Sequence, residues 1–390
     1  MRAATQHRSA DGASLYVHVP FCVVKCGYCD FNSYVVGDRT VHDVFLDALD
    51  AELAATWRGG APTSVFVGGG TPTLLDPPRF QRLFDVLGRH VALRECAEVT
   101  VEANPESVTA EKAAIARAAG VGRMSMGVQT FHARHLQFLD RAHAAERAEQ
   151  AFAELRAAGF ANLSVDLMFG IPGETADEWA ADLERALALR PDHLSCYNLT
   201  FEPGTKLHHA MEQGRVQPND DAVDRAMFLH TRQRLAEAGF DAYEISNFAG
   251  AGGPCRHNDH YWLQGDYVGV GPGASSHRQG VRWTNLKPVE AWAKAALAGA
   301  PAAGSAETLR PRQRAAEAIW LGLRRRDGVD FAAIGARLDV DVEAAFGAIR
   351  DRQAAAGDVV CDGDVVRLSA SGLLFADRLS GDYLGAGLPG

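Results

Sequence analysis

Short apolar runs rich in β-branched residues alternate with longer amphipathic stretches between residues 14 and 200. The short runs have the length and composition of buried strands, and the longer ones repeat apolar residues with the period of a helix. Such alternation predicts an α/β fold in which helices cover a parallel sheet, arranged as a doubly wound sheet or as an incomplete barrel. The predicted strands cover residues 14–19, 64–70, 98–104, 123–129, 162–170 and 193–200.

Polar residues and glycines gather where these predicted strands end. They are the sequence GGGT at 68–71, Glu102, Asn104, Gln129, Asp166 and Asn198, together with the cysteines after the first strand. Parallel α/β folds build their sites from the carboxyl ends of strands. A site that collects residues from so many strands favours a closed or nearly closed ring over an open sheet.

The pattern changes after about residue 205, which predicts further parts of the chain. We predict a polar N-terminal tail at 1–13, a barrel at 14–235, and a barrel extension at 236–300 that is rich in glycine and histidine. Residues 301–390 show a helix–turn–helix pattern, a β-hairpin and a last helix. This order predicts a small α+β domain of the winged-helix type.

Composition and charge exclude several classes of protein. The chain has 390 residues, a formal charge of -10 and no long run of Lys or Arg, which argues against nucleic-acid binding. It has no apolar run long enough to span a membrane and no signal-like start, so we expect a cytoplasmic protein that touches a membrane at most peripherally. In that compartment the seven cysteines are expected to be thiols or metal ligands rather than disulfides.

Three cysteines stand close together, directly after the first predicted strand. Cys22, Cys26 and Cys29 have the spacing C-x3-C-x2-C. Zinc sites usually pair two C-x2-C arms and no second arm follows, although zinc with a distant fourth ligand, or three unrelated thiols, stays open at this point. Three thiolates on one loop could instead bind three corners of a [4Fe–4S] cluster and leave its fourth iron open for a substrate or cofactor.

This loop, with the aromatic Tyr28 before its third cysteine, resembles that of the radical S-adenosylmethionine (SAM) superfamily. The resemblance implies a partial (β/α)6 TIM-like barrel, a [4Fe–4S] cluster held by Cys22, Cys26 and Cys29, and SAM bound to the open iron. It also implies one-electron chemistry that is supplied by the cluster and SAM.

Other residues at the predicted strand ends match SAM-binding positions of that superfamily in order and spacing. A glycine-rich turn would let the backbone approach the cofactor, and Glu102 would hydrogen-bond its charged or ribose groups. Taken alone, each of these residues has an ordinary alternative role as a cap or in a βα turn. The resemblance implies SAM contacts by Tyr16, Tyr28, Gly69, Gly70, Thr71, Glu102, Gln129, Arg141 and Asp166.

Longer sequence blocks narrow the resemblance to the HemN/HemW branch of the superfamily, over residues 14–380. These blocks include LYVHVPFC, GGGTPTLL, EANPES and DLMFGIPGET. The branch contains oxygen-independent coproporphyrinogen III dehydrogenases and heme chaperones. The dehydrogenases carry a fourth cysteine two residues after the third, where this chain has Phe31, and a long N-terminal arm, where this chain has about 15 residues before its first strand.

A third feature, HNDHYW at 257–262, matches the HNxxYW pattern of the heme chaperones. It implies heme binding with His257 as the expected axial ligand, because heme iron accepts imidazole or thiolate and the porphyrin face packs on aromatic rings. The alternative is that these residues only pack a turn. The other candidate heme contacts, rival ligands first and aromatic packing residues last, are Cys255, His260, His208, His209, His277, Tyr261 and Trp262.

We therefore expect a heme chaperone that binds heme, a [4Fe–4S] cluster and SAM. It would deliver heme to acceptor proteins and take electrons from a donor such as flavodoxin or ferredoxin. The competing prediction is an enzyme that converts coproporphyrinogen III to protoporphyrinogen IX, an activity that Phe31 and HNDHYW lead us not to expect. A third prediction is a zinc-bound scaffold.

Overall fold

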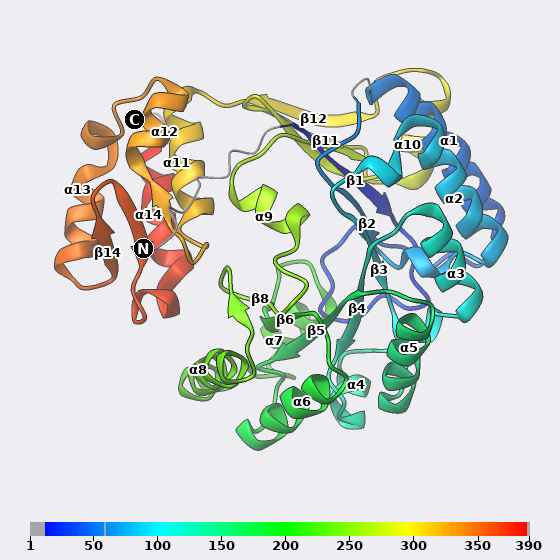
Figure 1. Cartoon of the computed structure of the whole chain (residues 1–390), viewed down its shortest axis with the longest axis horizontal. Helices are drawn as coiled ribbons and strands as arrows, with labels where there is room; N and C mark the ends of the chain where they lie inside the picture. Colours follow the sequence, from blue (N-terminus) through cyan, green and yellow to red (C-terminus); the bar gives the residue numbers. More distant parts are fainter. Residues whose placement is uncertain (1–11, 58–59, 388–390) are drawn as a thin grey trace.

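One large curved sheet dominates the computed structural model, which describes residues 12–57 and 60–387 (Figure 1). Within those residues the sheet has twelve strands, and its centre is a run of parallel strands that pair in sequence order. This arrangement confirms the predicted α/β fold. Of the two predicted forms, the sheet is an incomplete barrel and not a doubly wound sheet. The central strands are β1 (Ser14–Val19), β2 (Val65–Gly69), β3 (Val99–Ala103), β4 (Arg123–Gln129), β5 (Asn162–Phe169) and β6 (His193–Asn198).

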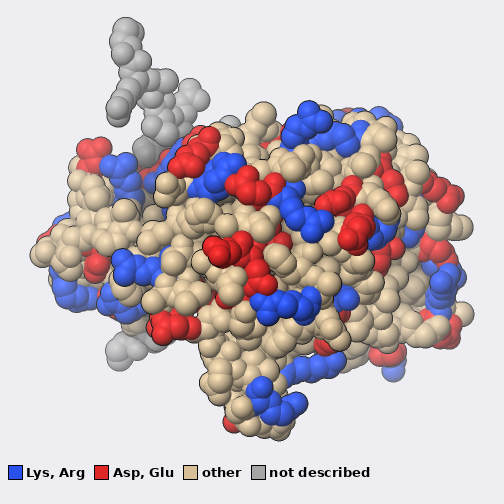
Figure 2. Space-filling view, turned by 90° about the horizontal axis from the view of Figure 1, so that it is seen from below, with Lys and Arg blue, Asp and Glu red and all other residues tan. Residues whose placement is uncertain are grey.

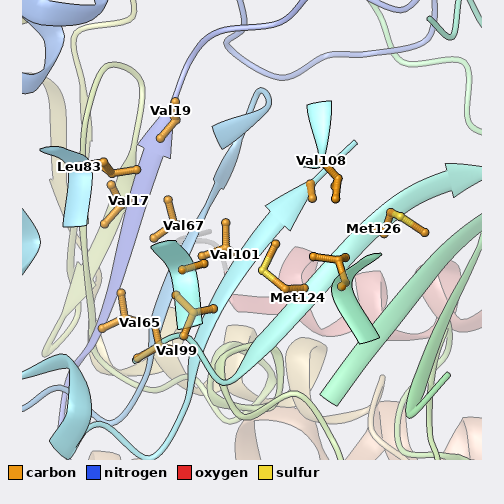
Figure 3. Packing of buried hydrophobic residues seen from close by; sticks show 14 of the residues in the cluster. Val17, Val19, Val65, Val67, Leu83, Val99, Val101, Val108, Met124 and Met126 are labelled. Carbon is orange, nitrogen blue, oxygen red and sulfur yellow. The ribbon is translucent and has the colours of Figure 1, made fainter. Parts of the chain in front are cut away.

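Alternate residues of the central strands point to opposite faces of the sheet, and the outer helices cover one of these faces (Figure 1). Val17 and Val19 of β1 are fully buried and belong to one apolar cluster with Leu83 of the helical layer (Figure 3). Tyr16 and His18 alternate with them and therefore face the inside of the curve. The outer helices are α1 (Thr40–Thr56), α2 (Pro77–His90), α3 (Ala110–Ala119), α4 (Ala133–Phe138), α5 (Ala145–Ala157) and α6 (Ala176–Ala188).

The barrel stays open because each end of the parallel run pairs with later strands instead of with the other end. Beside β6 lie β8 (Asn247–Ala249) and β7 (Asp241–Ala242), which follow α7 (Lys206–Glu212) and α8 (Asp221–Glu237). Beside β1 lies β9 (Tyr267–Val270), which pairs with it in parallel and is followed by antiparallel β10 (Ser275–Arg278), β11 (Val281–Asn285) and β12 (Ala303–Thr308).

The segment 236–300, predicted as one barrel extension, is thus divided between the two edges of the open barrel. Its chain crosses from β8 to β9, and the crossing contains α9 (Arg256–Trp262), which carries the whole HNDHYW sequence. Figure 1 shows α9 on the inner side of the curved sheet. After β11, α10 (Val289–Leu297) packs on α1.

The C-terminal part has the predicted order of helices followed by a hairpin and a last helix. It contains α11 (Pro311–Gly322), α12 (Phe331–Leu338), α13 (Val342–Ala355) and α14 (Ala376–Gly387), with a small sheet in the order β13 (Val329–Asp330), β15 (Val365–Leu368), β14 (Val359–Asp362). The predicted boundary at residue 301 falls too early, because β12 belongs to the large sheet. All six residues of β12 are exposed, so its pairing rests on backbone hydrogen bonds that leave no apolar pattern in the sequence.

The predicted tail at 1–13 lies almost entirely outside the described residues. Figure 2 shows acidic and basic side chains interspersed over one face of the molecule, without a large patch of one sign. Among the residues that the structure describes, none of the helices combines the length and the apolar character needed to cross a membrane.

A buried carboxylate holds the β9–β11 segment against the helical layer. Glu52 of α1 accepts hydrogen bonds from the backbone N–H of Gly271 (2.7 Å), from Asn285 Nδ2 (2.7 Å) and from Trp292 Nε1 (3.0 Å). Burial raises the pKa of this carboxyl to about 7, although the three donors oppose the rise. One side chain therefore fixes the turn after β9, the end of β11 and helix α10.

Replacing Glu52 by alanine is expected to lower the free energy of unfolding by about 2–4 kcal/mol, because three buried donors lose their acceptor. Urea unfolding followed by circular dichroism measures this. The exposed Glu237→Ala serves as a control and should change stability by less than about 0.5 kcal/mol. Equal effects of the two substitutions would show that the Glu52 contacts carry no stability.

Candidate cofactor and ligand site

The cysteine loop follows β1 and is anchored at both of its ends. Cys22 N–H donates to the carbonyl of Tyr34 (3.0 Å), and Cys29 N–H donates to the carbonyl of Cys26 (3.2 Å). Asn32 Nδ2 donates to the carbonyls of Pro272 and of Lys287, both at 2.9 Å. The three cysteines are partly exposed free thiols, so the loop presents its sulfurs on a fixed backbone.

A ring of polar contacts connects two of these sulfurs to the ends of β2, β3 and β4. Thr71 Oγ1 lies 3.7 Å from Cys22 Sγ, and Arg141 Nη1 lies 3.8 Å from Cys26 Sγ. Asn104 joins the two, because its Nδ2 donates to Thr71 Oγ1 (2.9 Å) and its Oδ1 accepts from Arg141 Nη2 (2.8 Å). The structure therefore brings Thr71 and Arg141, both predicted from the sequence, to the cysteine loop.

The surroundings of the sulfurs and of Arg141 are compatible with a cluster and a bound ligand. Burial raises the pKa values of the Cys22 and Cys29 thiols, so a positively charged metal group would stabilise the thiolates that ligation needs. Arg141 Nε is buried and has no hydrogen-bond partner among the described residues, which leaves a donor for an anionic group. In the described part of the chain no three His, Cys, Asp or Glu side chains converge on a single metal ion; in an iron–sulfur cluster, by contrast, each thiolate binds its own iron.

The glycine turn after β2 approaches the cysteine loop too closely for any side chain. Gly69 has φ +105°, and a Cβ there would lie 2.4 Å from the His18 ring. A Cβ on Gly70 would lie 2.6 Å from the carbonyl oxygen of Phe21. Only glycine fits these two positions, which the sequence assigned to cofactor contact.

Glu102 lies behind this turn on β3. Its Oε2 accepts a hydrogen bond from the backbone N–H of Gly69 (3.0 Å). Burial raises the pKa of Glu102 to about 7, and the nearby charge of Asp166 adds to the rise. Asp166 on β5 accepts from Ser125 Oγ (3.1 Å), and burial raises its pKa as well. Both carboxyls thus face the inside of the barrel, as their strand positions predict.

Gln129 ends β4 in a strained conformation. Its φ is +69°, and the register of β4 with β5 shifts between Gly127 and Gln129. A non-glycine residue in this region costs about 1–3 kcal/mol and is common at binding sites. Gln129 thus lies at the carboxyl end of β4, on the same edge of the sheet as the turn after β2.

The two predicted tyrosines lie in different places. Tyr28 is beside Arg141 and packs with the apolar group that includes Leu139 and Met168. Tyr16 lies further down the inner face, with its hydroxyl 2.9 Å from His18 Nδ1 and its ring against Phe66. Tyr28 therefore belongs to the cysteine loop, whereas Tyr16 belongs to the aromatic surroundings of α9.

His257, the expected heme ligand, is a buried residue with both ring nitrogens in use. Nδ1 is 2.8 Å from Ser64 Oγ and Nε2 is 2.8 Å from the Tyr261 hydroxyl. The ring stacks on Phe66 at 5.1 Å, and only 2 % of the residue is exposed. The expectation that His257 binds heme iron is therefore not supported by this geometry, because an axial bond would have to replace one of these hydrogen bonds.

The rival ligands of the motif are also committed to the packing of α9. The Cys255 thiol is buried 3.4 Å from Glu98 Oε1, and burial raises its pKa to about 12. Glu98 also accepts from the backbone N–H groups at the start of α9. His260 Nε2 is 2.7 Å from the carbonyl of Asp266, and the Trp262 ring lies under the Arg324 guanidinium at 5.1 Å. The HNDHYW residues thus form contacts that hold α9 in place within the fold.

The remaining histidines of the heme prediction differ in placement. His208 and His209 lie on α7, which contacts the cysteine loop through Leu207 N–H and the carbonyl of Gly27, and the side chain of His209 is 64 % exposed. His277 lies on β10, is buried, and lines a cavity together with Tyr16 and Tyr261. Of the three, only His277 lies near the motif.

The fold and the cysteine loop define a radical SAM protein, and family comparison agrees. Residues 16–186 match the radical SAM superfamily, whose members use a [4Fe–4S] cluster and SAM, and residues 309–375 match the HemN C-terminal domain.

The chain is 40 % identical over 381 residues to the heme chaperone HemW of Mycobacterium tuberculosis, covering 95 % of this chain and 94 % of the relative. It is 34 % identical to HemW of Bacillus subtilis over 95 % of this chain and 99 % of that protein. The chain belongs to the HemW family.

A solved structure supports the fold separately. Coproporphyrinogen III oxidase (HemN) from Escherichia coli, described as a radical SAM enzyme, superposes with a TM-score of 0.83. It covers 97 % of this chain and 91 % of its own, at 24 % sequence identity. The two proteins share the whole arrangement of barrel and C-terminal domain.

Sequence reasoning missed Asn32 and Glu98, two residues that organise the site, and named a third, Asn104, only as a polar residue at a strand end. Asn104 connects Thr71 to Arg141, Asn32 ties the cysteine loop to the turns after β9 and β11, and Glu98 caps α9. Asn32 follows the cysteines, so a search for polar residues at that position could have found it. Glu98 has no such signal, because its partner is 158 residues away in the sequence.

The free energy of unfolding is expected to fall with pH below about 6.5, partly through His257. Burial lowers the pKa of this imidazole from 6.5 to about 3, so the unfolded chain binds a proton that the folded chain excludes. Between pH 7 and pH 5 this one group should cost about 2 kcal/mol.

Urea unfolding at the two pH values, in the wild type and in His257→Gln, isolates that contribution. The glutamine variant should lose less stability on acidification by about that amount, whereas His209→Gln on the exposed α7 should behave as the wild type. A pH dependence unchanged in His257→Gln would mean that the imidazole is not buried as described.

Proposed function

We propose that this chain is a heme chaperone, which binds heme and passes it to acceptor proteins. The observation that carries the proposal is the identity of 40 % over nearly the whole chain to a protein named as a heme chaperone. Phe31 supports it, because the dehydrogenases of the resembling branch have cysteine at this position. Its side chain is exposed beside the cysteine loop and offers an apolar surface instead of a thiol.

Cys22, Cys26 and Cys29 are the proposed ligands of the [4Fe–4S] cluster, with SAM at the open iron. Arg141 and Thr71 donate hydrogen bonds toward the sulfurs, which stabilises thiolate charge. When bound, the cluster and SAM supply one-electron chemistry. The protein's own residues hold the sulfurs in place and keep one buried guanidinium N–H, Arg141 Nε, available to an anionic group.

The proposed SAM-binding residues come from four neighbouring strands. Gly69 and Gly70 let the turn after β2 pass close to the cysteine loop, and Glu102 supplies a carboxylate beside them. Gln129 and Asp166 complete the inner surface from β4 and β5. These side chains bind and orient SAM next to the cysteine loop.

The proposed electron donor, a flavodoxin or ferredoxin, approaches at the cysteine loop. Val23, Val24 and Val35 flank the cysteines and are exposed, together with Phe31. Exposed apolar groups of this kind mark surfaces where another protein docks. A reducing, cytoplasmic compartment remains the expected location, in which the seven cysteines, all free of disulfides in the structure, stay thiols or metal ligands.

Two assays on anaerobically reconstituted protein distinguish the chaperone from the competing enzyme. With hemin, the protein should show a stable Soret band and transfer heme to an apo-acceptor such as apomyoglobin. With coproporphyrinogen III, SAM and reductant it should form no protoporphyrinogen IX, which a positive control with a coproporphyrinogen III dehydrogenase verifies. Formation of protoporphyrinogen IX, or absence of hemin binding, would contradict the proposal.

SAM binding is expected to strengthen as pH rises through 7, because Glu102 becomes a carboxylate there. If the ionised form alone contacts the positive charge of SAM, its dissociation constant falls roughly tenfold between pH 6 and pH 8. Equilibrium binding of SAM to wild type and Glu102→Gln measures this, since glutamine keeps an acceptor for Gly69. The variant should lack the Glu102 part of the pH dependence, and identical profiles would rule out this role.

A further inference from the structure

A cavity of about 410 Å³ lies between the inner face of β1, β9 and β10 on one side and α11 of the C-terminal part on the other. Its volume is within the range of about 300–1,000 Å³ that is usual for small-molecule sites. The residues that give it character are aromatic rings and two imidazoles, contributed by Tyr16, Phe31, Tyr261, Tyr267, Trp320, His18 and His277. Such a lining suits a flat, largely apolar ligand.

His277 has the chemistry of an axial ligand. The residue is 6 % exposed, and its Nε2 is buried with no hydrogen-bond partner among the described residues. Nδ1 faces the carbonyl of Gly265 at 3.4 Å and the Asp266 carboxylate at 3.7 Å. A carbonyl or carboxylate on Nδ1 keeps the proton there and leaves the lone pair on Nε2 for a metal.

The other histidines near the cavity lack this free nitrogen. His18 lines the same cavity, but its Nδ1 contacts the Tyr16 hydroxyl at 2.9 Å and its Nε2 contacts the carbonyl of Asn32 at 2.8 Å. His257 has both nitrogens engaged by Ser64 and Tyr261. His277 is thus the imidazole of the described cavity lining that can accept a metal without breaking a hydrogen bond.

The charges of the cavity are balanced within the protein. Arg282 lines it but pairs with Glu307 at 2.6 Å and with Glu317, which lines the cavity as well. A ligand that relied on carboxylates would compete with Glu317 for this guanidinium. Carboxylate groups are therefore expected at the open side, and the interior selects for a planar ring and a metal.

We propose that heme binds in this cavity with His277 Nε2 as its axial ligand and the aromatic rings against the porphyrin. This inference rests on the proposed function and assigns the site at which heme is held. Phe31, 58 % exposed, lies where the cavity meets solvent and places the porphyrin edge next to the cysteine loop.

The test compares hemin with metal-free protoporphyrin IX, using full-length protein, porphyrin absorbance and quenching of tryptophan fluorescence. Ligation by His277 predicts that the wild type binds hemin at least tenfold more tightly than the metal-free ring. In His277→Ala this preference should disappear, while the affinity for metal-free protoporphyrin IX stays the same. Added imidazole should restore the nitrogen-ligated Soret band of the variant.

Two further variants test the site independently of the axial bond. Trp320→Ala should weaken hemin and metal-free protoporphyrin IX alike by at least fivefold, because it removes a ring that packs on both. His209→Ala on α7 is the matched control and should bind both as the wild type does. Circular dichroism shows whether each variant is folded, and imidazole rescue establishes the same for the site of His277→Ala.

The outcomes separate this inference from the proposed function. Unchanged hemin affinity and spectrum in His277→Ala, with hemin bound and transferred by the wild type, would overturn the site while leaving the chaperone proposal intact. Failure of the wild type to bind hemin at all would overturn both. Unchanged binding of both porphyrins in Trp320→Ala would place the ligand outside this cavity.

Discussion

A buried chain of hydrogen bonds through His257 fixes α9 against the first two strands of the barrel. Ser14 Oγ lies 2.9 Å from Ser64 Oγ, which lies 2.8 Å from His257 Nδ1, and His257 Nε2 lies 2.8 Å from the Tyr261 hydroxyl. The starts of β1 and β2 are thereby joined to α9. Such a network is worth about 1 kcal/mol net per bond, but leaving one of its buried groups unpaired costs more, so the fold keeps all of them together.

The same helix carries the C-terminal part on its other side. Asp259 pairs with Arg325 at 2.9 Å, and Arg324 covers the ring of Trp262. Because α9 contacts both the open barrel and α11, it sets the distance between the two walls of the aromatic cavity. An incomplete barrel needs such a filling element, since it has no opposite wall of its own. The HNDHYW segment supplies this filling element. The motif would thus support a heme site by positioning its walls and not by bonding to the iron.

The cysteine loop connects the two candidate sites. Its cysteines face the carboxyl ends of β2, β3 and β4, while Phe31 and Asn32, a few residues on, line the cavity. Asn32 also binds the backbone on either side of the β10–β11 hairpin, and its carbonyl contacts His18. A cluster and a heme held in this way would share one short loop, so Phe31 marks a junction between the sites as well as the absence of a fourth cysteine.

Much of this could be predicted from the sequence, because the signals are local. Each central strand carries its own apolar alternation, and the cysteines, the glycine turn and Arg141 follow one another in a recognisable order. The pairing of β9 with β1 joins residues about 250 positions apart and has no local signal, and β12 is hidden because all its side chains are exposed. The surroundings of His257 were unpredictable for a related reason: the residue type indicates a ligand, whereas its burial and its contacts with Ser64 and Phe66 appear only in the folded chain.

The most direct test of this account is anomalous diffraction at the iron absorption edge, from crystals of anaerobically reconstituted protein grown with heme. The account predicts two separate iron sites, a cluster on Cys22, Cys26 and Cys29 and a single heme iron bonded to His277 Nε2, with α9 in place. A heme iron bonded to His257 or Cys255, with the hydrogen bond to Ser64 or the contact with Glu98 broken, would contradict it.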